Sequence, residues 1–170
     1  TPWYFNTIRT FNLSFPADGA TLQPPDVQLK WDAVSGINFY EYELSKDTLF
    51  TNPMSFTSDT NVNYADELSF GTTYYLRARA VHDNDKSDWT DFRGFTTIQK
   101  VYLISPTDNS TNVSIRPIMK WADISGVTKY QLQYADNPAF TNSFEFSFTD
   151  GQTEYQVEGD GLDSATVYYW

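Results

Sequence analysis

The sequence predicts an all-β protein made of two tandem β-sandwiches. Three observations lead to this prediction. Aromatic residues make up 18% of the chain, with 12 Tyr and 13 Phe, and such residues are enriched in strands. Short segments alternate between apolar and polar residues, which is typical of half-buried strands. The sequence also matches itself at a shift of 90 positions, which carries Trp31 onto Trp121.

The internal match is long and, in its first part, free of gaps. Its length indicates a duplicated structural unit rather than chance similarity of composition. After Phe56 small insertions accumulate, so that we pair Tyr64 with Tyr155. The matching segments are Lys30-Trp31 with Lys120-Trp121, Ser35-Gly36 with Ser125-Gly126, Phe50-Thr51-Asn52 with Phe140-Thr141-Asn142, and Leu68 to Tyr74 with Leu162 to Tyr168.

The same match makes predictions about both ends of the sequence. Phe5, Thr7 and Ile8 match Phe95, Thr97 and Ile98, so residues 1–10 are expected to be a strand-like tail of a preceding repeat and a linker. Residues 11–99 are then the first repeat, and residues 100–170 a second repeat that is incomplete at its last two strands. The favoured explanation is a fragment of a longer array, and the alternative is exchange of a strand between copies.

Individual strands can be placed by their alternation. Three segments of the first repeat alternate over five to seven residues, and turn-forming residues separate them. No window shows a sustained helical period, and a parallel α/β fold would need intervening helices. The alternating segments are Val27-x-Leu29-x-Trp31, Tyr40-x-Tyr42-x-Leu44 and Tyr74-x-Leu76-x-Ala78-x-Ala80.

On these residues the chain resembles fibronectin type III domains, which are immunoglobulin-like β-sandwiches. Trp31 and Trp121 take the place of the family's strand B tryptophan. The segments ending in Tyr74 and Tyr168 resemble the family's L-x-P-x-T-x-Y motif, with Phe70 and Ser164 in place of the proline. The resemblance implies that both tyrosines bond back to the upstream backbone.

The resemblance also points to a subfamily. The segments SPTDNSTNV, YQLQYADNPAF and TTYYLRARA look like repeats of large secreted and cell-surface proteins of Bacteroidota-type bacteria. Such proteins often leave the cell by the type IX secretion route. The resemblance therefore implies an extracellular, bacterial setting. It also makes Thr48 and Ser164, which follow Asp47 and Asp163, candidates for O-glycosylation.

Charge and composition exclude several classes of partner. The formal net charge of −11 argues against binding to nucleic acid or anionic membranes. The chain has no cysteine, so it has no disulfide framework. It also has no apolar run of about 18 residues, so no membrane insertion is expected.

No catalytic residue is expected. His82 is the only histidine, which leaves no zinc site of His and Cys ligands and no Ser-His-Asp arrangement. The alternating carboxylates Asp83, Asp85 and Asp88 are a weak candidate for a calcium loop. The Gly and Glu that an EF-hand needs at positions 6 and 12 are replaced by Asp88 and Gly94, which favours a polar hairpin turn. Calcium is therefore the one cofactor that the sequence suggests.

Aromatic residues outside the alternating core pattern are candidates for binding. Aromatic rings recognise proteins and sugars by stacking and apolar contact. The alternatives are cross-strand packing and contact between domains. The candidate binding aromatics are Trp3, Tyr4, Tyr75 and Tyr102, with Tyr169 as a further exposed ring.

Taken together, these features predict a non-catalytic structural or adhesive module that acts as a spacer or as a protein or glycan interaction surface. Its expected partners are neighbouring repeats of the same polypeptide, other proteins and surface glycans. Two alternatives remain open. One is an accessory region of a secreted polysaccharide-degrading enzyme, and the other is a cargo segment recognised by a secretion machine.

Overall fold

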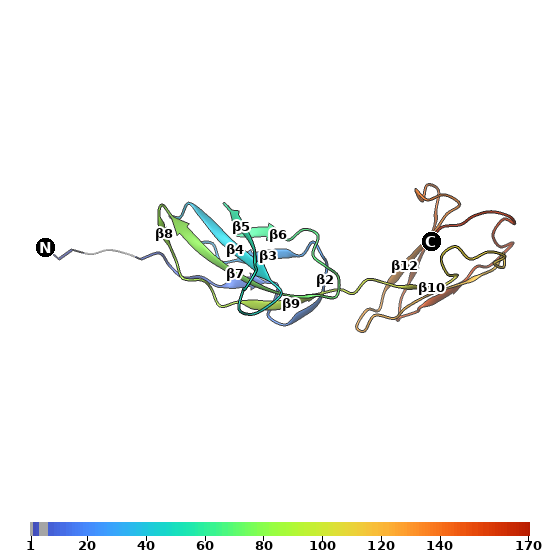
Figure 1. The fold of residues 1–170 in the computed structure, drawn as a ribbon, viewed down its shortest axis with the longest axis horizontal. Coiled ribbons are helices and arrows are strands. Elements are labelled where there is room, and N and C mark those ends of the chain that lie inside the picture. Colours follow the sequence, from blue (N-terminus) through green and yellow to red (C-terminus); the bar gives the residue numbers. More distant parts are fainter. Residues whose placement is uncertain (1, 4–6) are drawn as a thin grey trace. The chain divides into compact units, whose positions relative to one another are not determined.

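The computed structural model describes residues 2–3 and 7–170, and all regular structure within these residues is β-strand. The chain divides into two compact units, Thr1–Lys100 and Val101–Trp170, which we call the first and second unit. Figure 1 shows the strands of both units, and each unit is described by itself. The predicted all-β fold class is confirmed.

The first unit is a sandwich of two sheets. One sheet has the order β1-β3-β6, and the other is six-stranded with the order β2-β9-β7-β4-β5 and β8 paired to β7. All pairs are antiparallel except β2–β9. The strands are β1 (Leu13–Phe15), β2 (Ala20–Gln23), β3 (Gln28–Trp31), β4 (Phe39–Ser45), β5 (Met54–Ser58), β6 (Val62–Tyr64), β7 (Thr73–His82), β8 (Asp85–Lys86) and β9 (Arg93–Thr97).

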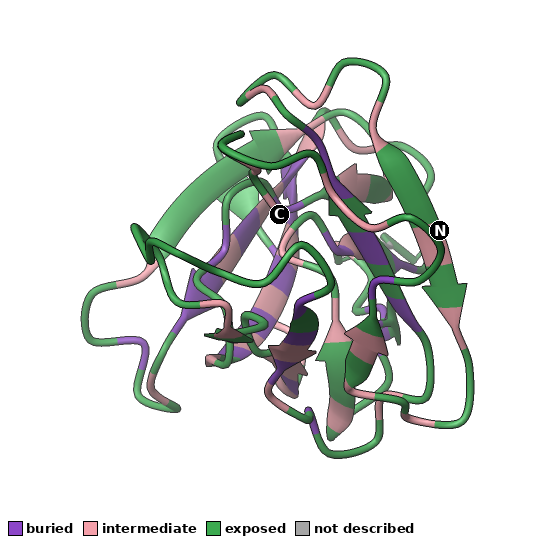
Figure 2. Ribbon diagram, turned by 90° about the vertical axis from the view of Figure 1, so that its right-hand side faces the viewer, coloured by how far each residue is buried: buried purple, intermediate pink, exposed green. Residues whose placement is uncertain are grey.

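The core of the first unit follows from the alternation of its strands. Successive side chains of a strand point to opposite faces, so every second residue of β3, β4 and β7 is buried. Figure 2 shows the ribbon coloured by burial, with buried residues in purple. Trp31 lies at the centre and contacts Tyr40 and Tyr42, with ring centroids 5.5 and 5.3 Å away. The small residues Ala78 and Ala80 on β7 are fully buried beside this aromatic cluster, where large side chains would overpack.

The second unit repeats part of this framework. Its first sheet has the order β10-β11-β14, its second sheet pairs β12 with β13, and an isolated bridge joins Ala135 to Tyr169. The same register holds at a shift of 90, including the bulge in the first strand: Leu13 faces Trp31 in one unit and Leu103 faces Trp121 in the other. The strands are β10 (Leu103–Ser105), β11 (Ile118–Trp121), β12 (Tyr130–Tyr134), β13 (Phe144–Phe148) and β14 (Glu154–Gln156).

The two tryptophans have equivalent surroundings. Trp121 contacts Tyr130 with ring centroids 5.9 Å apart, as Trp31 contacts Tyr40. Each of these tyrosines accepts a hydrogen bond from a nearby backbone: from Val34 N–H at 2.7 Å, and from Ile124 N–H at 2.9 Å. Both indole Nε1 groups are buried without a hydrogen-bond partner in the described part of the chain. The duplicated core is therefore preserved in detail.

The tyrosine corner that the resemblance implies is present in both units. Ser69 N–H donates to the Tyr74 hydroxyl at 3.0 Å, and Asp163 N–H donates to the Tyr168 hydroxyl at 3.2 Å. Tyr74 is buried, whereas Tyr168 is half-buried. The hydroxyl thus ties the loop before the strand to the start of the strand.

The predicted pairing of Tyr64 with Tyr155 is wrong by one residue. Asn63 faces Leu29 in the first unit, and Tyr155 faces Met119 in the equivalent place. A shift of one residue moves a side chain to the opposite face of the sheet. Accordingly Tyr155 packs on the core, with its ring 4.4 Å from Phe146, while Tyr64 is mostly exposed.

The strand-like tail predicted for residues 1–10 has no strand in its described residues, 2–3 and 7–10. Tyr4 and Phe5 lie outside the described residues. Ile8 packs against the core of the first unit. In the second unit the described residues form no strand after β14, and Tyr169 contributes only the bridge to Ala135.

Replacing Tyr74 by Phe tests the corner hydrogen bond. The Tyr74→Phe variant removes the acceptor of the partly buried hydrogen bond from Ser69 N–H, so we expect the free energy of unfolding of the first unit to fall by about 1 kcal/mol. Urea denaturation followed by tryptophan fluorescence measures the change. The matched control is Tyr75→Phe on the opposite face of the same strand, which should change the free energy by less than about 0.5 kcal/mol. Equal losses in both variants would contradict the role of the hydroxyl.

Candidate functional site

A row of charged and aromatic side chains covers the outer face of the β4–β7 strand pair. Glu41 and Glu43 point outward from β4 because Tyr40, Tyr42 and Leu44 point into the core. Arg77 and Arg79 do the same on β7, where they lie directly opposite the two glutamates. Trp89 lies on the two arginines. We call these five residues, Glu41, Glu43, Arg77, Arg79 and Trp89, the Trp89 ladder.

Ion pairs join the two strands of the ladder. Arg77 and Glu43 approach to 2.6 Å, as do Arg79 and Glu41. Lys86 on β8 adds a second contact to Glu41 at 2.7 Å. The pairs are directly opposite in register and are shielded by the indole, so they are more favourable than typical exposed pairs.

Trp89 is held against the arginines by its neighbours in the chain. Ser87 N–H donates to Ala80 O and Thr90 N–H donates to Ala78 O, both at 2.9 Å, so this segment runs along the edge of β7. The indole ring centroid then lies 4.5 Å from the Arg77 guanidinium carbon and 4.2 Å from that of Arg79. Contacts of this length are favourable cation–π interactions.

The ladder shifts the protonation of Glu41. Burial raises the pKa of Glu41, but hydrogen bonds from Lys86 and Arg79, together with their positive charges, outweigh it and hold the pKa below its ordinary value. The carboxylate is therefore ionised over a wider range of acid pH. Every charge of the ladder has an opposite partner, so the arrangement braces the sheet and leaves no group placed to donate or remove a proton from a substrate.

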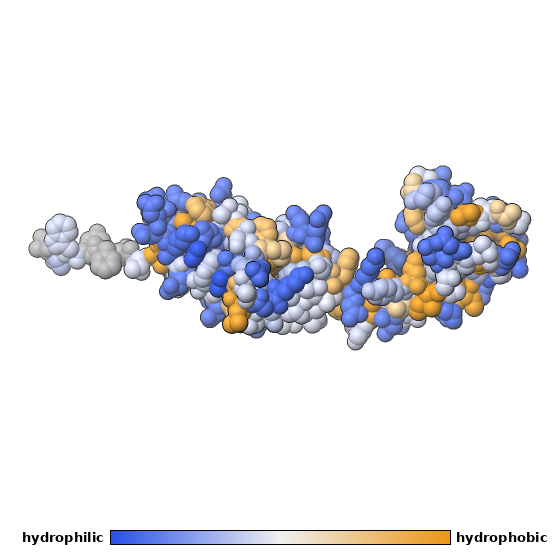
Figure 3. Space-filling view, in the orientation of Figure 1, coloured by the Kyte–Doolittle hydropathy of each residue, from blue (hydrophilic) through white to orange (hydrophobic). Residues whose placement is uncertain are grey.

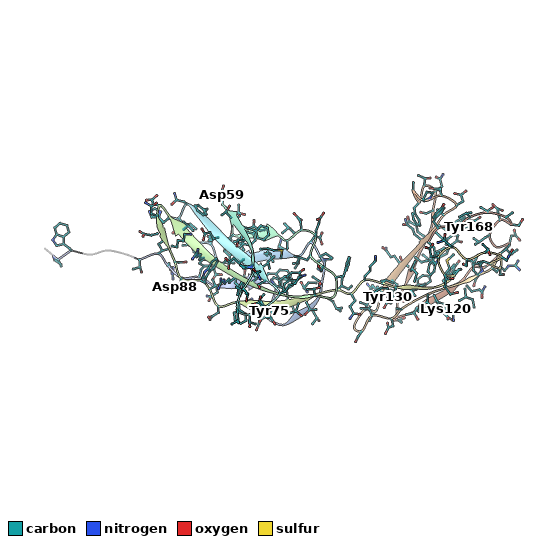
Figure 4. All side chains as sticks on the ribbon, viewed as in Figure 1. Asp59, Tyr75, Asp88, Lys120, Tyr130 and Tyr168 are labelled. Atoms are coloured by element: carbon teal, nitrogen blue, oxygen red, sulfur yellow. The ribbon has the colours of Figure 1, made fainter. Side chains whose placement is uncertain are left out.

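Tyr75, labelled in Figure 4, is the candidate binding aromatic next to the ladder. It is half-buried, and its ring meets the Phe92 ring edge-on at 5.6 Å. Phe92 in turn lies 6.2 Å from Phe50, whose ring contacts Arg77. Tyr75 thus takes part in packing between neighbouring segments, which was one of the alternatives considered.

The other candidate aromatics belong to two different units. Trp3 is fully exposed in the first unit, and Tyr102 is 68% exposed in the second unit. Tyr4 lies outside the described residues. Tyr169 forms the bridge to Ala135.

The candidate calcium loop comprises the turn between β7 and β8, strand β8 itself and the two residues that follow it. Asp83 N–H donates to Asn38 Oδ1 at 2.7 Å, and the Asp83 carboxylate lies 3.6 Å from His82 Nε2. Asp85 and Asp88 are exposed. Among residues 2–3 and 7–170, no group of three or more His, Cys, Asp or Glu side chains is placed to hold a metal ion, so the structure does not bring the three carboxylates together as ligands.

The two candidate glycosylation sites lie on exposed turns. Thr48 follows Asp47, whose carboxylate accepts bonds from Leu49 N–H at 2.9 Å and Thr51 N–H at 3.3 Å. Desolvation raises the pKa of Asp47, but hydrogen bonds from Thr51, Ser45 and Leu49 outweigh it and lower the pKa overall. Ser164 is exposed in the loop before Tyr168. Both hydroxyl groups are open to solvent.

A shallow depression of 270 Å³ lies beside His82 in the first unit. It is lined by residues 7–9 and 33–37 as well as His82. Its walls come from loops and from His82 at the end of β7. No helix in the described part of the chain is long and apolar enough to cross a membrane.

Comparison with known proteins identifies structural likeness only. No family model matches the chain, and no curated protein matches it. Chicken CNTN1 FN1-FN3 domains align with 96% of the chain at 17% identity and a TM-score of 0.45, and the chain spans 57% of that structure. A two-domain fibronectin type III segment of chicken tenascin aligns with 96% of the chain at 15% identity and a TM-score of 0.38, over 87% of that segment.

The class of protein is defined by the chain's own features. Two face-to-face sheets, antiparallel except for the β2–β9 pair, a buried tryptophan between them and a tyrosine corner give the first unit an immunoglobulin-like sandwich fold of fibronectin type III character. The second unit carries the same tryptophan, corner tyrosine and strand registers. The chain therefore has a tandem fibronectin type III-like fold.

Truncating Trp89 tests whether the ladder stabilises the first unit. Trp89→Ala removes two cation–π contacts and exposes the ion pairs to water, so we expect the free energy of unfolding to fall by about 2 kcal/mol. Chemical denaturation measures the change. Trp3→Ala is the matched control, because Trp3 is fully exposed and its removal should have no measurable effect. A loss below about 0.5 kcal/mol for Trp89→Ala would contradict the bracing role.

The ladder also predicts a pH dependence. Because the folded state lowers the pKa of Glu41, its contribution is present above the ordinary value of 4.5 and is lost as the pH falls through the lower folded value. We expect Glu41→Gln to cost about 1 kcal/mol at pH 7. The difference from the natural chain should shrink below about pH 4.5. Asp59→Asn, on the turn labelled in Figure 4, is the control and should show no such pH-dependent loss.

Proposed function

We propose that the chain is a non-catalytic structural module of an extracellular protein, which acts as a spacer within a series of sandwich repeats. One observation carries the proposal: the same tryptophan-centred framework occurs twice, in the same registers. Repeats of one unit lengthen a chain without adding a new active centre. The assignment to an extracellular protein is supported by the fibronectin type III-like fold, which is typical of extracellular proteins.

Pairing along both edges of strand β4 favours mechanical resistance in the first unit. Its strand β4 is paired along both edges, with β5 on one side and β7 on the other. The Trp89 ladder adds side-chain contacts between β4 and β7. Separating these strands requires breaking main-chain bonds and ion pairs together. This supports a role in which the module keeps its length under load.

A bacterial surface setting is part of the proposal. It is supported by the resemblance of the repeat segments to Bacteroidota-type surface proteins and by a net charge of −11, which favours solubility. Neighbouring repeats are the first partners proposed. Proteins or glycans could contact exposed rings such as Tyr102, and the role as an accessory region or as secretion cargo stays a prediction.

Single-molecule stretching tests the spacer role. Residues 11–97 of the first unit should unfold in one step and release about 300 Å of chain, at roughly 3.3–3.6 Å per residue. Trp89→Ala should lower the unfolding force without changing the released length, and Trp3→Ala should change neither. Gradual extension without a discrete step in the natural chain would contradict the proposal, as would turnover of a substrate that depends on residues of this chain.

A further inference from the structure

Strand β5 lies at one edge of the larger sheet of the first unit (Figure 1). The sheet order ends with β7-β4-β5, so within the described residues β5 pairs with β4 only. Every second residue of an edge strand directs its N–H and C=O groups away from the sheet. The main chain of β5 is therefore open to pairing with a further strand.

This edge carries no charge. Strand β5 has the sequence Met54-Ser55-Phe56-Thr57-Ser58, whereas sheet edges are commonly protected from pairing by charged side chains or proline. The equivalent strand of the second unit, β13, carries Glu145 in the place of Ser55. The edge of β5 thus lacks a protection that its duplicate has, in a chain whose net charge is −11.

Apolar side chains are exposed along the same edge. Phe56 is 41% exposed and Met54 is 39% exposed. Both point to the core side of the sheet, because they lie opposite Tyr42 and Leu44. The Phe56 ring stacks on Tyr42, with ring centroids 5.0 Å apart. Figure 3 shows apolar residues, in orange, at the surface of the first unit. Phe56 is therefore packed on Tyr42 and also accessible to a partner.

The internal duplication shows which kind of side chain covers this position. Phe146 is the equivalent of Phe56, and it is half-buried. The Tyr155 ring lies 4.4 Å from it. In the first unit Asn63 takes the place of Tyr155, and an amide covers less of a ring than a phenol does. In the described residues, an aromatic contact that the second unit makes internally is thus replaced beside Phe56 by a smaller polar group.

We propose that β5 is the strand through which two copies of this chain pair, edge to edge. The two β5 strands run antiparallel about a two-fold axis at Phe56, so that Phe56 of each copy lies opposite Phe56 of the other. The ring from the second copy then covers Phe56, as Tyr155 covers Phe146 in the second unit.

The sequence of β5 is complementary to itself in this register, which is why a second copy is the occupant. Met54 lies opposite Ser58 and Ser55 lies opposite Thr57, so inward residues meet inward residues and outward residues meet outward ones. Aromatic pairs and Ser–Thr pairs are favourable across strands. Two acidic chains repel each other, and the uncharged β5 edge is a place where they approach without like charges in contact.

The acidic residue beside this edge is already neutralised. Glu43 lies opposite Ser55 on β4, and its carboxylate is 2.6 Å from the Arg77 guanidinium. The Ser55 hydroxyl also donates a hydrogen bond to Glu43 at 3.3 Å. A second β5 strand therefore meets a neutral outer face as well as a neutral edge.

Sedimentation velocity of the full chain, over a range of about 5–500 μM, measures the association. We expect a monomer–dimer equilibrium with a dissociation constant on the order of 100 μM, because pairing of one short strand makes a small, transient interface. Hydrogen exchange at the highest concentration should show new protection at residues 54–58.

Three variants locate the interface. Phe56→Asp places two carboxylates opposite each other at the axis and should weaken dimerisation about tenfold or more. Asn63→Tyr supplies a covering ring from within the chain, as Tyr155 does, and should weaken dimerisation about fivefold while keeping the fold. The matched control is Phe144→Asp, on the exposed and equivalent strand β13, which should leave dimerisation unchanged. Circular dichroism checks that each variant folds.

The inference is overturned if the natural chain stays monomeric at about 500 μM, or if Phe56→Asp and Asn63→Tyr both fold and dimerise as the natural chain does. Weakening by Phe144→Asp alone, or protection outside residues 54–58, would assign the interface to another surface. The stretching experiment is read on single chains, so its failure would leave this result unaffected.

Discussion

The structure depends on one buried contact, the packing of a tryptophan against a tyrosine from the facing sheet. Trp31 and Tyr40 make this contact in the first unit, and Trp121 and Tyr130 in the second. The indole is the largest side chain that the space between two sheets accommodates, and its burial supplies much of the apolar area that drives the sheets together. In each unit the tyrosine hydroxyl also accepts a hydrogen bond from a backbone N–H in the turn that precedes it. The contact therefore sets the spacing of the sheets and ties down the loop that connects them.

The outer face of the first unit is organised by charged side chains. Strands β4 and β7 carry like charges at alternate positions, two glutamates on one strand and two arginines on the other. The antiparallel register places unlike charges opposite each other, and Trp89 covers them. This turns a row of surface charges into a set of shielded pairs. The second unit has glutamines in place of the two glutamates, so the same framework presents a neutral outer surface on β12.

The two units also differ in how much of the core is covered. In the first unit a hairpin closes the sandwich, and Leu13 is buried. In the second unit the equivalent leucine is half exposed, and the adjoining strand edge pairs through one bridge. The repeated framework is therefore covered to different extents in the described residues of the two units.

The sequence by itself determined the fold class, the duplication and most of the core, because strand alternation and a repeat at 90 positions depend only on the order of residues. It also identified both corner tyrosines. The tertiary structure decided what depends on pairing between distant segments. Tyr155 was paired with Tyr64 instead of with Asn63, because an insertion shifts the register without changing the local pattern. The Trp89 ladder was missed, although Glu41 and Glu43 alternate visibly, since its partners lie more than 30 residues away. The difference in burial between Leu13 and Leu103 likewise depends on tertiary structure, since both leucines stand in matching local sequence.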